Sequence, residues 1–209
     1  MSIDVPSLIG AVTREVRNVE REGRTARVVL ATRTYDTSVE DLWDAISNAE
    51  RLPRWFAPVT GDFKLGGKYQ VQGNASGTIT RCEPPKHLAL TWEFGGGVSW
   101  VEVDLAKDGD GARLELRHIA YPEAHWDQFG AGAVGIGWEL GLLGLYLHLS
   151  NPSQAKPPES DPAWGATDEA KSFMRASGDR WGEAEAAVED REVALKRAET
   201  TKKFYCGES

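Results

Sequence analysis

Hydrophobic and polar residues alternate with a period of two along much of the first 120 residues. Segments 88–94 and 114–118 show this alternation most clearly. It places on one face of each segment Leu88, Leu90, Trp92 and Phe94, and then Leu114, Leu116 and His118. Short runs of this kind, separated by Gly- and Pro-rich turns, are typical of antiparallel strands linked by hairpins. The pattern also predicts strands over 12–21 and 24–35.

The segment 98–106 has a less regular pattern. Its valines Val101 and Val103 fall on one face, whereas Trp100 falls on the other face together with Glu102. Either a β-bulge shifts the alternation, or an aromatic side chain lies on the outer face of the sheet. The sequence leaves both alternatives open.

Two segments change to a helical period. Residues 38–48 form an amphipathic stretch that begins with Ser38 as a candidate N-cap. Residues 129–150 predict a long apolar helix, which at about 1.5 Å per residue can span a whole sheet. This run is long enough to cross a bilayer. Because Glu139 and His148 interrupt it, we predict a buried amphipathic helix and no membrane insertion.

The pattern divides the chain into four parts. Residues 1–23 hold the first strand of a leading hairpin, and residues 24–150 form the main domain. The Pro- and Ser-rich residues 151–162 predict a linker, and residues 163–209 a helical extension. Asp161 is a candidate N-cap for a helix starting at Pro162. The extension is expected to pack on the domain or on a second copy of the chain.

The composition of the chain argues against some classes of function. The 209 residues include 24 Lys and Arg against 32 Asp and Glu, so the net charge of −8 argues against a nucleic-acid partner held by the overall field. The first ten residues lack a basic and apolar leader, which predicts a cytoplasmic protein. Eight tryptophans allow a large aromatic core or a large aromatic cavity.

Catalytic and metal-binding motifs are missing from the sequence. The two cysteines have no metal-ligand spacing, no G-x-S-x-G motif is present, and the Gly-rich stretches do not form a phosphate loop. We therefore assign no catalytic residue, no metal and no cofactor. His87 and His125 are predicted to be exposed in loops, and His148 to stabilise a helix C-terminus through its charge.

Three polar residues have two interpretations each. His118 is either a core histidine bonded to a backbone carbonyl or a group that orients a ligand. Glu139 and Glu102 are expected on solvent-facing sides, because a buried carboxylate without a partner is costly. If either carboxylate faced a cavity, its pKa would rise and it could act as an acid or a polar anchor.

Five stretches together resemble a known family. They are RTYDTSVEDLWDAISNAERLPRWF, FKLGGKYQV, CEPPKHLALTWEF, VSWVEVDL and GWELGLLGLYLHL. They are similar to the SRPBCC (START-like, helix-grip) superfamily, and within it to a bacterial branch that resembles the C-terminal domain of the activator of 90-kDa heat-shock protein ATPase homologue family. The resemblance covers about residues 24–150.

The resemblance implies an α+β helix-grip fold, in which a curved antiparallel sheet wraps around a long C-terminal helix and encloses a hydrophobic cavity. The residues expected to line that cavity come from every element that would border it. They are Trp55, Phe56, Tyr69, Leu90, Trp92, Trp100, His118, Trp138, Leu142 and Tyr146.

The main hypothesis is binding of a hydrophobic small molecule that is lipid-, polyketide- or aromatic-like. One alternative is an aromatase or cyclase type of enzyme, which would need a polar pair such as His118 with Glu139 or Glu102. Another is an interaction protein that modulates a chaperone, or that meets a second copy or another partner through its C-terminal helices. A likeness of fold alone does not assign a reaction.

Overall fold

The computed structural model describes residues 3–153 and 163–208. These residues form two compact units, each assembled from segments that are distant in the sequence. Unit 1 comprises Met1–Ala31, Tyr121–Leu143 and Pro158–Ser209, and unit 2 comprises Thr32–Ala120 and Gly144–Pro157.

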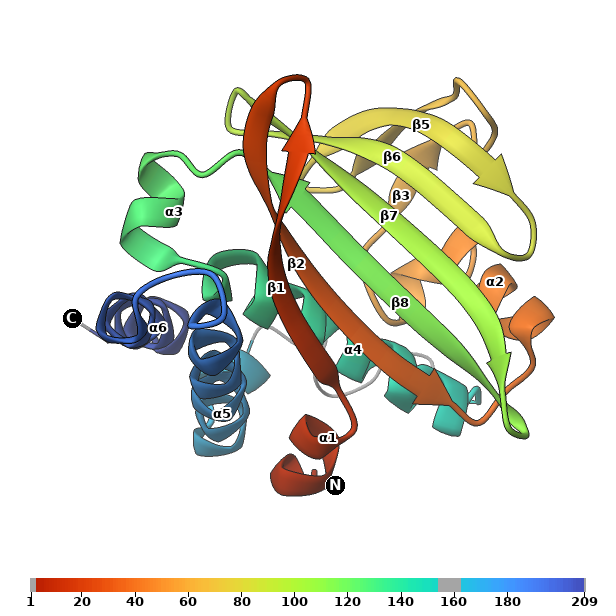
Figure 1. The fold of residues 1–209 in the computed structure, drawn as a ribbon. Helices are drawn as coiled ribbons and strands as arrows, with labels where there is room; N and C mark the ends of the chain where they lie inside the picture. The colour runs from red at the N-terminus through yellow and green to blue at the C-terminus, as the bar shows by residue number, and fades with distance from the viewer. Residues whose placement is uncertain (1–2, 154–162, 209) are drawn as a thin grey trace. The chain divides into compact units, whose positions relative to one another are not determined.

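The strands form one eight-stranded sheet with the order β1-β2-β8-β7-β6-β5-β4-β3 (Figure 1). Their bounds are β1 Thr13–Arg21, β2 Arg24–Tyr35, β3 Val59–Gly61, β4 Lys68–Val71, β5 Ser76–Glu83, β6 His87–Phe94, β7 Gly97–Asp108 and β8 Gly111–Ala120. Neighbouring strands from β3 to β8 pair antiparallel. The strands predicted from alternation at 12–21, 24–35, 88–94 and 114–118 are therefore confirmed.

The register of β7 decides between the two alternatives for segment 98–106. β7 pairs with β6 and β8 without a shift, so that Val101 stands opposite Leu90 and His118. Alternation then places Trp100 on the other face of the sheet, and the outer-face alternative is the one the structure adopts. A register shift does occur where β5 pairs with β6, between Ile79 and Arg81 of β5.

In unit 2, a helix and a short turn follow β2. Helix α2 (Val39–Ser47) is capped as predicted, because the Ser38 hydroxyl accepts a hydrogen bond from the Asp41 amide at 3.1 Å. The short helix η1 (Leu52–Arg54) then leads to Trp55, whose indole donates to the Ala45 carbonyl at 3.0 Å. A Cβ at Gly144 would lie 2.4 Å from the Trp55 carbonyl oxygen, so glycine permits this close approach.

The helix predicted over 129–150 begins three residues later, at Gly132, and a separate short helix precedes it. Helix α3 (Ala124–Phe129) ends at Gly130, whose positive φ of 58° breaks the helix, and α4 (Gly132–Ser150) follows. Apolar residues lie all around α4, so it is not amphipathic. Among the described residues α4 is the one helix long and apolar enough to span a membrane, but half of that stretch is buried in the protein, as in a core helix.

Unit 1 contains the helical extension. Besides α3 and the first part of α4, unit 1 contains α1 (Val5–Gly10) and the helices of the extension. These are η3 (Trp164–Ala166), α5 (Asp168–Glu185) and α6 (Arg191–Cys206), and α5 and α6 lie side by side (Figure 1). Thr167 caps α5, since its hydroxyl accepts from the Ala170 amide at 3.2 Å. The predicted cap Asp161 and first position Pro162 lie outside the described residues.

Candidate functional site

The two faces of β6, β7 and β8 differ in chemistry. We call the face that carries Leu90, Trp92, Ser99, Val101, Leu116 and His118 the inner face, and the opposite one the outer face. On the inner face most side chains that these strands contribute are buried, and all are uncharged except Lys107 at the exposed end of β7. The outer face carries Trp100, Glu102, Asp104, Glu115 and Arg117.

His118 is a buried histidine of the inner face. Its side chain is 4% exposed, and its Nε2 lies 2.9 Å from the Ser99 hydroxyl on the neighbouring strand. The Trp92 ring meets it edge-on, with the ring centroids 6.4 Å apart. Burial lowers the pKa of His118 to about 4, so the imidazole is neutral at pH 7.

Tyr69 extends the inner face onto β4. It stands opposite Gly77, and its hydroxyl donates to the Thr91 carbonyl at 2.6 Å. Burial raises the pKa of this phenol, which therefore stays protonated. The structure thus brings together on one sheet face Tyr69, Leu90, Trp92 and His118.

The remaining predicted site residues lie on other elements. Trp55 and Phe56 are half-buried after η1, with ring centroids 5.5 Å apart. Tyr146 on α4 is 38% exposed, and the Arg33 guanidinium lies 4.5 Å above its ring. Trp138 and Leu142 belong to the part of α4 in unit 1, where Leu142 is buried and Trp138 half-buried. Trp100 is half-buried on the outer face.

Glu139 is buried, which contradicts its predicted solvent-facing position. It is 1% exposed, and its two carboxylate oxygens accept from Nε and Nη2 of Arg14 at 2.6 and 2.7 Å. Arg14 also donates to the backbone carbonyls of Val12 and Ile9. The buried carboxylate is tolerated because this arginine neutralises it and satisfies both oxygens.

Glu102 lies on the outer face in a network centred on Arg117. The Arg117 guanidinium contacts Glu102 at 3.2 Å and Glu115 at 2.6 Å, and it also bonds Asp104. Partial burial would raise the pKa of Asp104, but hydrogen bonds from His87 and Arg117 outweigh it and hold that pKa below its ordinary value. Neither Glu102 nor Glu139 is therefore paired with His118.

Two histidine predictions are wrong and one is confirmed. His87 is half-buried, with Nδ1 2.6 Å from an Asp104 oxygen. His148 is 2% exposed, and burial together with the charge of Arg51 lowers its pKa, so it cannot stabilise a helix end as a cation. His125 is exposed as predicted, although on α3 and not in a loop.

His148 belongs to a polar cluster that the sequence pattern did not indicate. The Arg51 Nε donates to Nε2 of His148 at 3.3 Å, while Nη1 bonds Asp41 at 2.7 Å and Asp44 at 2.9 Å. Arg51 and His148 are 97 positions apart, so no local spacing could have paired them. Among residues 3–153 and 163–208, no cluster of three or more His, Cys, Asp or Glu could hold a metal ion.

Comparison with known proteins identifies relatives of known name. The family model described as "Activator of Hsp90 ATPase homolog 1-like protein" matches residues 36–146. The human Activator of 90 kDa heat shock protein ATPase homolog 1 is 36% identical over 75 residues, which cover 35% of this chain and 21% of the relative. The mouse protein is 35% identical over the same length. The match thus spans about a fifth of these curated relatives.

Solved structures share the fold over more of the chain. The solution structure of CalU16 from Micromonospora echinospora is 31% identical and covers 86% of this chain and 97% of its own, with a TM-score of 0.71. An Hsp90 activator from Plasmodium falciparum, at 23% identity and a TM-score of 0.50, covers 62% of this chain and 97% of its own and shows likeness of fold alone. The predicted α+β helix-grip fold is confirmed, and the chain belongs to the family of Activator of Hsp90 ATPase homolog 1-like proteins.

Proposed function

We propose that the chain binds an apolar small molecule, of a lipid-, polyketide- or aromatic-like class, against the inner face of unit 2. One observation carries the proposal. Trp92 is half-buried beside a neutral histidine, and the one charged residue that β6, β7 and β8 place on this face, Lys107, lies eight positions along β7 from the Ser99 that pairs with Trp92. Such a surface has apolar area left to bury and no strand charge near Trp92 that an apolar ligand would desolvate.

The polar atoms of this region are already bonded inside the protein. The Tyr69 hydroxyl donates to Thr91, the Trp55 indole to Ala45, and Nε2 of His118 meets the Ser99 hydroxyl. A ligand would therefore gain mainly from contact with ring surfaces. Burying about 100 Å² of apolar surface is worth about 2.5 kcal/mol, and micromolar binding corresponds to about 8 kcal/mol, so a ligand must bury well over about 300 Å² to offset the entropy cost of association as well.

Binding can be tested with two tryptophans that belong to adjacent residue pairs of β6 and β7 but point to opposite faces of the sheet. Trp92 stands opposite Ser99 on the inner face, and Trp100 opposite Thr91 on the outer face. We expect Trp92→Leu to weaken binding of the neutral probe N-phenyl-1-naphthylamine about tenfold, through lost ring contact, and Trp100→Leu to weaken it less than about twofold. Probe fluorescence measures both.

Native mass spectrometry of the purified full chain, followed by solvent extraction, would reveal a natural ligand. A stoichiometric apolar molecule supports the proposal. Equal loss of probe binding in the two leucine variants, or no probe binding by the wild type, would overturn it.

A second candidate function rests on the family. The curated relatives are named as activators of the 90-kDa heat-shock protein ATPase, so stimulation of an Hsp90-type chaperone is the alternative. The test is the ATPase rate of such a chaperone with and without the full chain. A rate that does not change with added chain contradicts this alternative and leaves the ligand proposal untouched.

The aromatase or cyclase alternative has less support. It needs a carboxylate beside His118, but Glu102 and Glu139 are both bonded to arginines. A cytoplasmic location and a homodimer through the C-terminal helices stay predictions.

A further inference from the structure

Helix α6 presents an exposed face with an apolar residue at each end. Val193 is 40% exposed and Phe204 is 66% exposed. The helical period places on one stripe, about 100° wide, the residues Val193, Lys196, Thr200, Lys203 and Phe204. We call these five residues the α6 stripe. From Val193 to Phe204 it is about 16 Å long, at about 1.5 Å per residue.

Phe204 is held in place from one side. Its ring centroid lies 5.3 Å from that of Phe129, which in turn lies 4.9 Å from the His125 ring. The hydroxyl of Thr201 donates to the Phe129 carbonyl at 2.6 Å, so α3 is fastened to α6. The exposed aromatic surface is therefore ordered before any partner binds, which lowers the entropy cost of binding.

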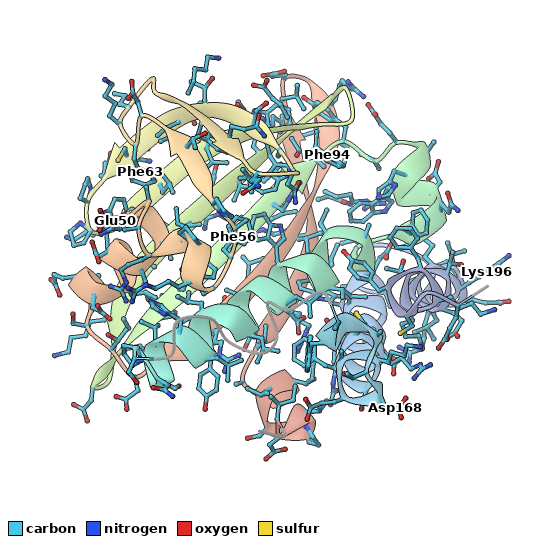
Figure 2. All side chains as sticks on the ribbon, turned by 180° about the vertical axis from the view of Figure 1, so that it is seen from behind. Glu50, Phe56, Phe63, Phe94, Asp168 and Lys196 are labelled. Atoms are coloured by element: carbon cyan, nitrogen blue, oxygen red, sulfur yellow. The ribbon has the colours of Figure 1, made fainter. Side chains whose placement is uncertain are left out.

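The free charges of the stripe are both positive. Other cations of α6 are engaged, since Arg197 pairs with Glu185, and Lys202 with Asp179. Lys196 and Lys203 form no ion pair within residues 3–153 and 163–208, and Lys196 extends outward from α6 (Figure 2). Lys203 does lie near Glu199, whose pKa is lowered first by its hydrogen bond to Lys202 and then by the charges of Lys202 and Lys203. These two cations stand out on a chain whose net charge is −8.

We propose that the α6 stripe docks an acidic amphipathic helix of another protein. An apolar side chain of that helix packs on the open side of Phe204, and two carboxylates meet Lys196 and Lys203. The two lysines are seven residues apart, about 10 Å along the axis, which matches carboxylates two turns apart on the partner. Aromatic anchors flanked by complementary charge are typical of protein interfaces.

The charges argue against a second copy as the occupant. A two-fold contact through the stripe would bring the lysines of one copy toward those of the other, and like charges repel. The stripe lies in unit 1 and uses none of the inner-face residues, so this inference stands independently of the ligand proposal.

The test uses the full chain, labelled with ¹⁵N, and a synthetic helical peptide with Glu at two positions seven apart and Leu between them. Two control peptides carry Lys in place of Glu, or Ser in place of Leu. We expect amide shift changes confined to α3 and α6, about tenfold weaker binding of each control peptide, and weaker binding at about 300 mM salt than at about 50 mM.

Variants locate the site. Because its residues are exposed, Lys196→Glu/Lys203→Glu should fold normally and weaken binding of the Glu peptide about tenfold or more. Phe204→Ser should weaken it about fivefold or more. The matched control is Lys107→Glu on β7, another exposed lysine, which should change binding less than about twofold.

Four results would overturn the proposal. The first three are equal binding of the Lys peptide, shift changes away from α3 and α6, and no shift change at about 1 mM peptide. The fourth is a set of α6 shifts that depends on protein concentration without peptide, which would make a second copy the occupant.

Discussion

The inner and outer faces of β6, β7 and β8 share the same strands and the same backbone hydrogen bonds, yet they treat charge in opposite ways. On β8, Leu116 and His118 face inward and are buried and uncharged, while Glu115 and Arg117 face outward and are paired. The outer charges keep contact with water and with one another. The inner positions offer no such compensation, so even histidine is neutral there.

The two-residue period of the strands separates charged from uncharged chemistry within one sheet. An aromatic residue is compatible with either face, as Trp92 and Trp100 show. A charged residue is compatible with the inner face only where it reaches water, as Lys107 does at the end of β7, or where it finds a dedicated partner. Glu139 is buried in unit 1 because Arg14 is such a partner.

The largest effect is expected from moving a charge to the inner face. Leu116→Asp should lower the free energy of unfolding by about 5 kcal/mol, because the carboxylate would be buried unpaired. The inverse exchange on the outer face, Glu115→Leu, should cost less than about 1 kcal/mol. Urea denaturation followed by circular dichroism measures both. If Leu116→Asp does not fold, Leu116→Ala should still show a loss of about 3 kcal/mol. Equal midpoints for Leu116→Asp and the wild type would refute the distinction.

The second effect is a loss of stability in acid. His118 has a folded pKa of about 4 against about 6.5 in the unfolded chain, so the unfolded state takes up the proton first. Titration of His118 therefore costs no stability above about pH 6.5. As the pH drops from there to about 4, it lowers the free energy of unfolding by up to about 3 kcal/mol.

His118→Gln should flatten this part of the stability profile measured by urea denaturation across that pH range. Some slope should remain, because the pKa of His148 is lowered as well. The control is His125→Gln, which removes an exposed histidine and should leave the slope unchanged. A wild-type profile that stays flat from pH 7 to pH 4 contradicts the prediction.

A smaller effect is expected from breaking the outer network. Arg117→Ala should cost about 1 kcal/mol, because its partners are partly solvated, and high salt should reduce the difference. The pKa of Asp104 should rise toward its ordinary value, which carboxyl NMR can follow. Arg113→Ala, at an exposed position of the same strand, is the control. A loss above about 3 kcal/mol would show that the network behaves as a buried one.

The smallest effect is expected at the end of the inner face. Phe94 continues the alternation of Leu90 and Trp92, but it is 62% exposed beside the Gly95–Gly97 turn (Figure 2). Phe94→Ser should change the free energy of unfolding by less than about 0.5 kcal/mol. Thermal unfolding measures this, and a large loss would mean that the inner face extends to the turn.

The local elements of this protein can be predicted from its amino-acid sequence. Alternation predicted the strands, and Ser38 marked the start of α2. The family resemblance predicted the helix-grip fold. These signals are local in the chain because the periods of strands and helices depend on backbone geometry alone.

Which polar groups contact one another depends on tertiary packing. Arg14 and Glu139 are 125 positions apart, and Arg51 and His148 are 97 apart. The face on which Trp100 lies depended on the strand register. A buried charge is stable or unstable according to the partner that the fold brings to it, and hydrophobic periodicity carries no information about that partner.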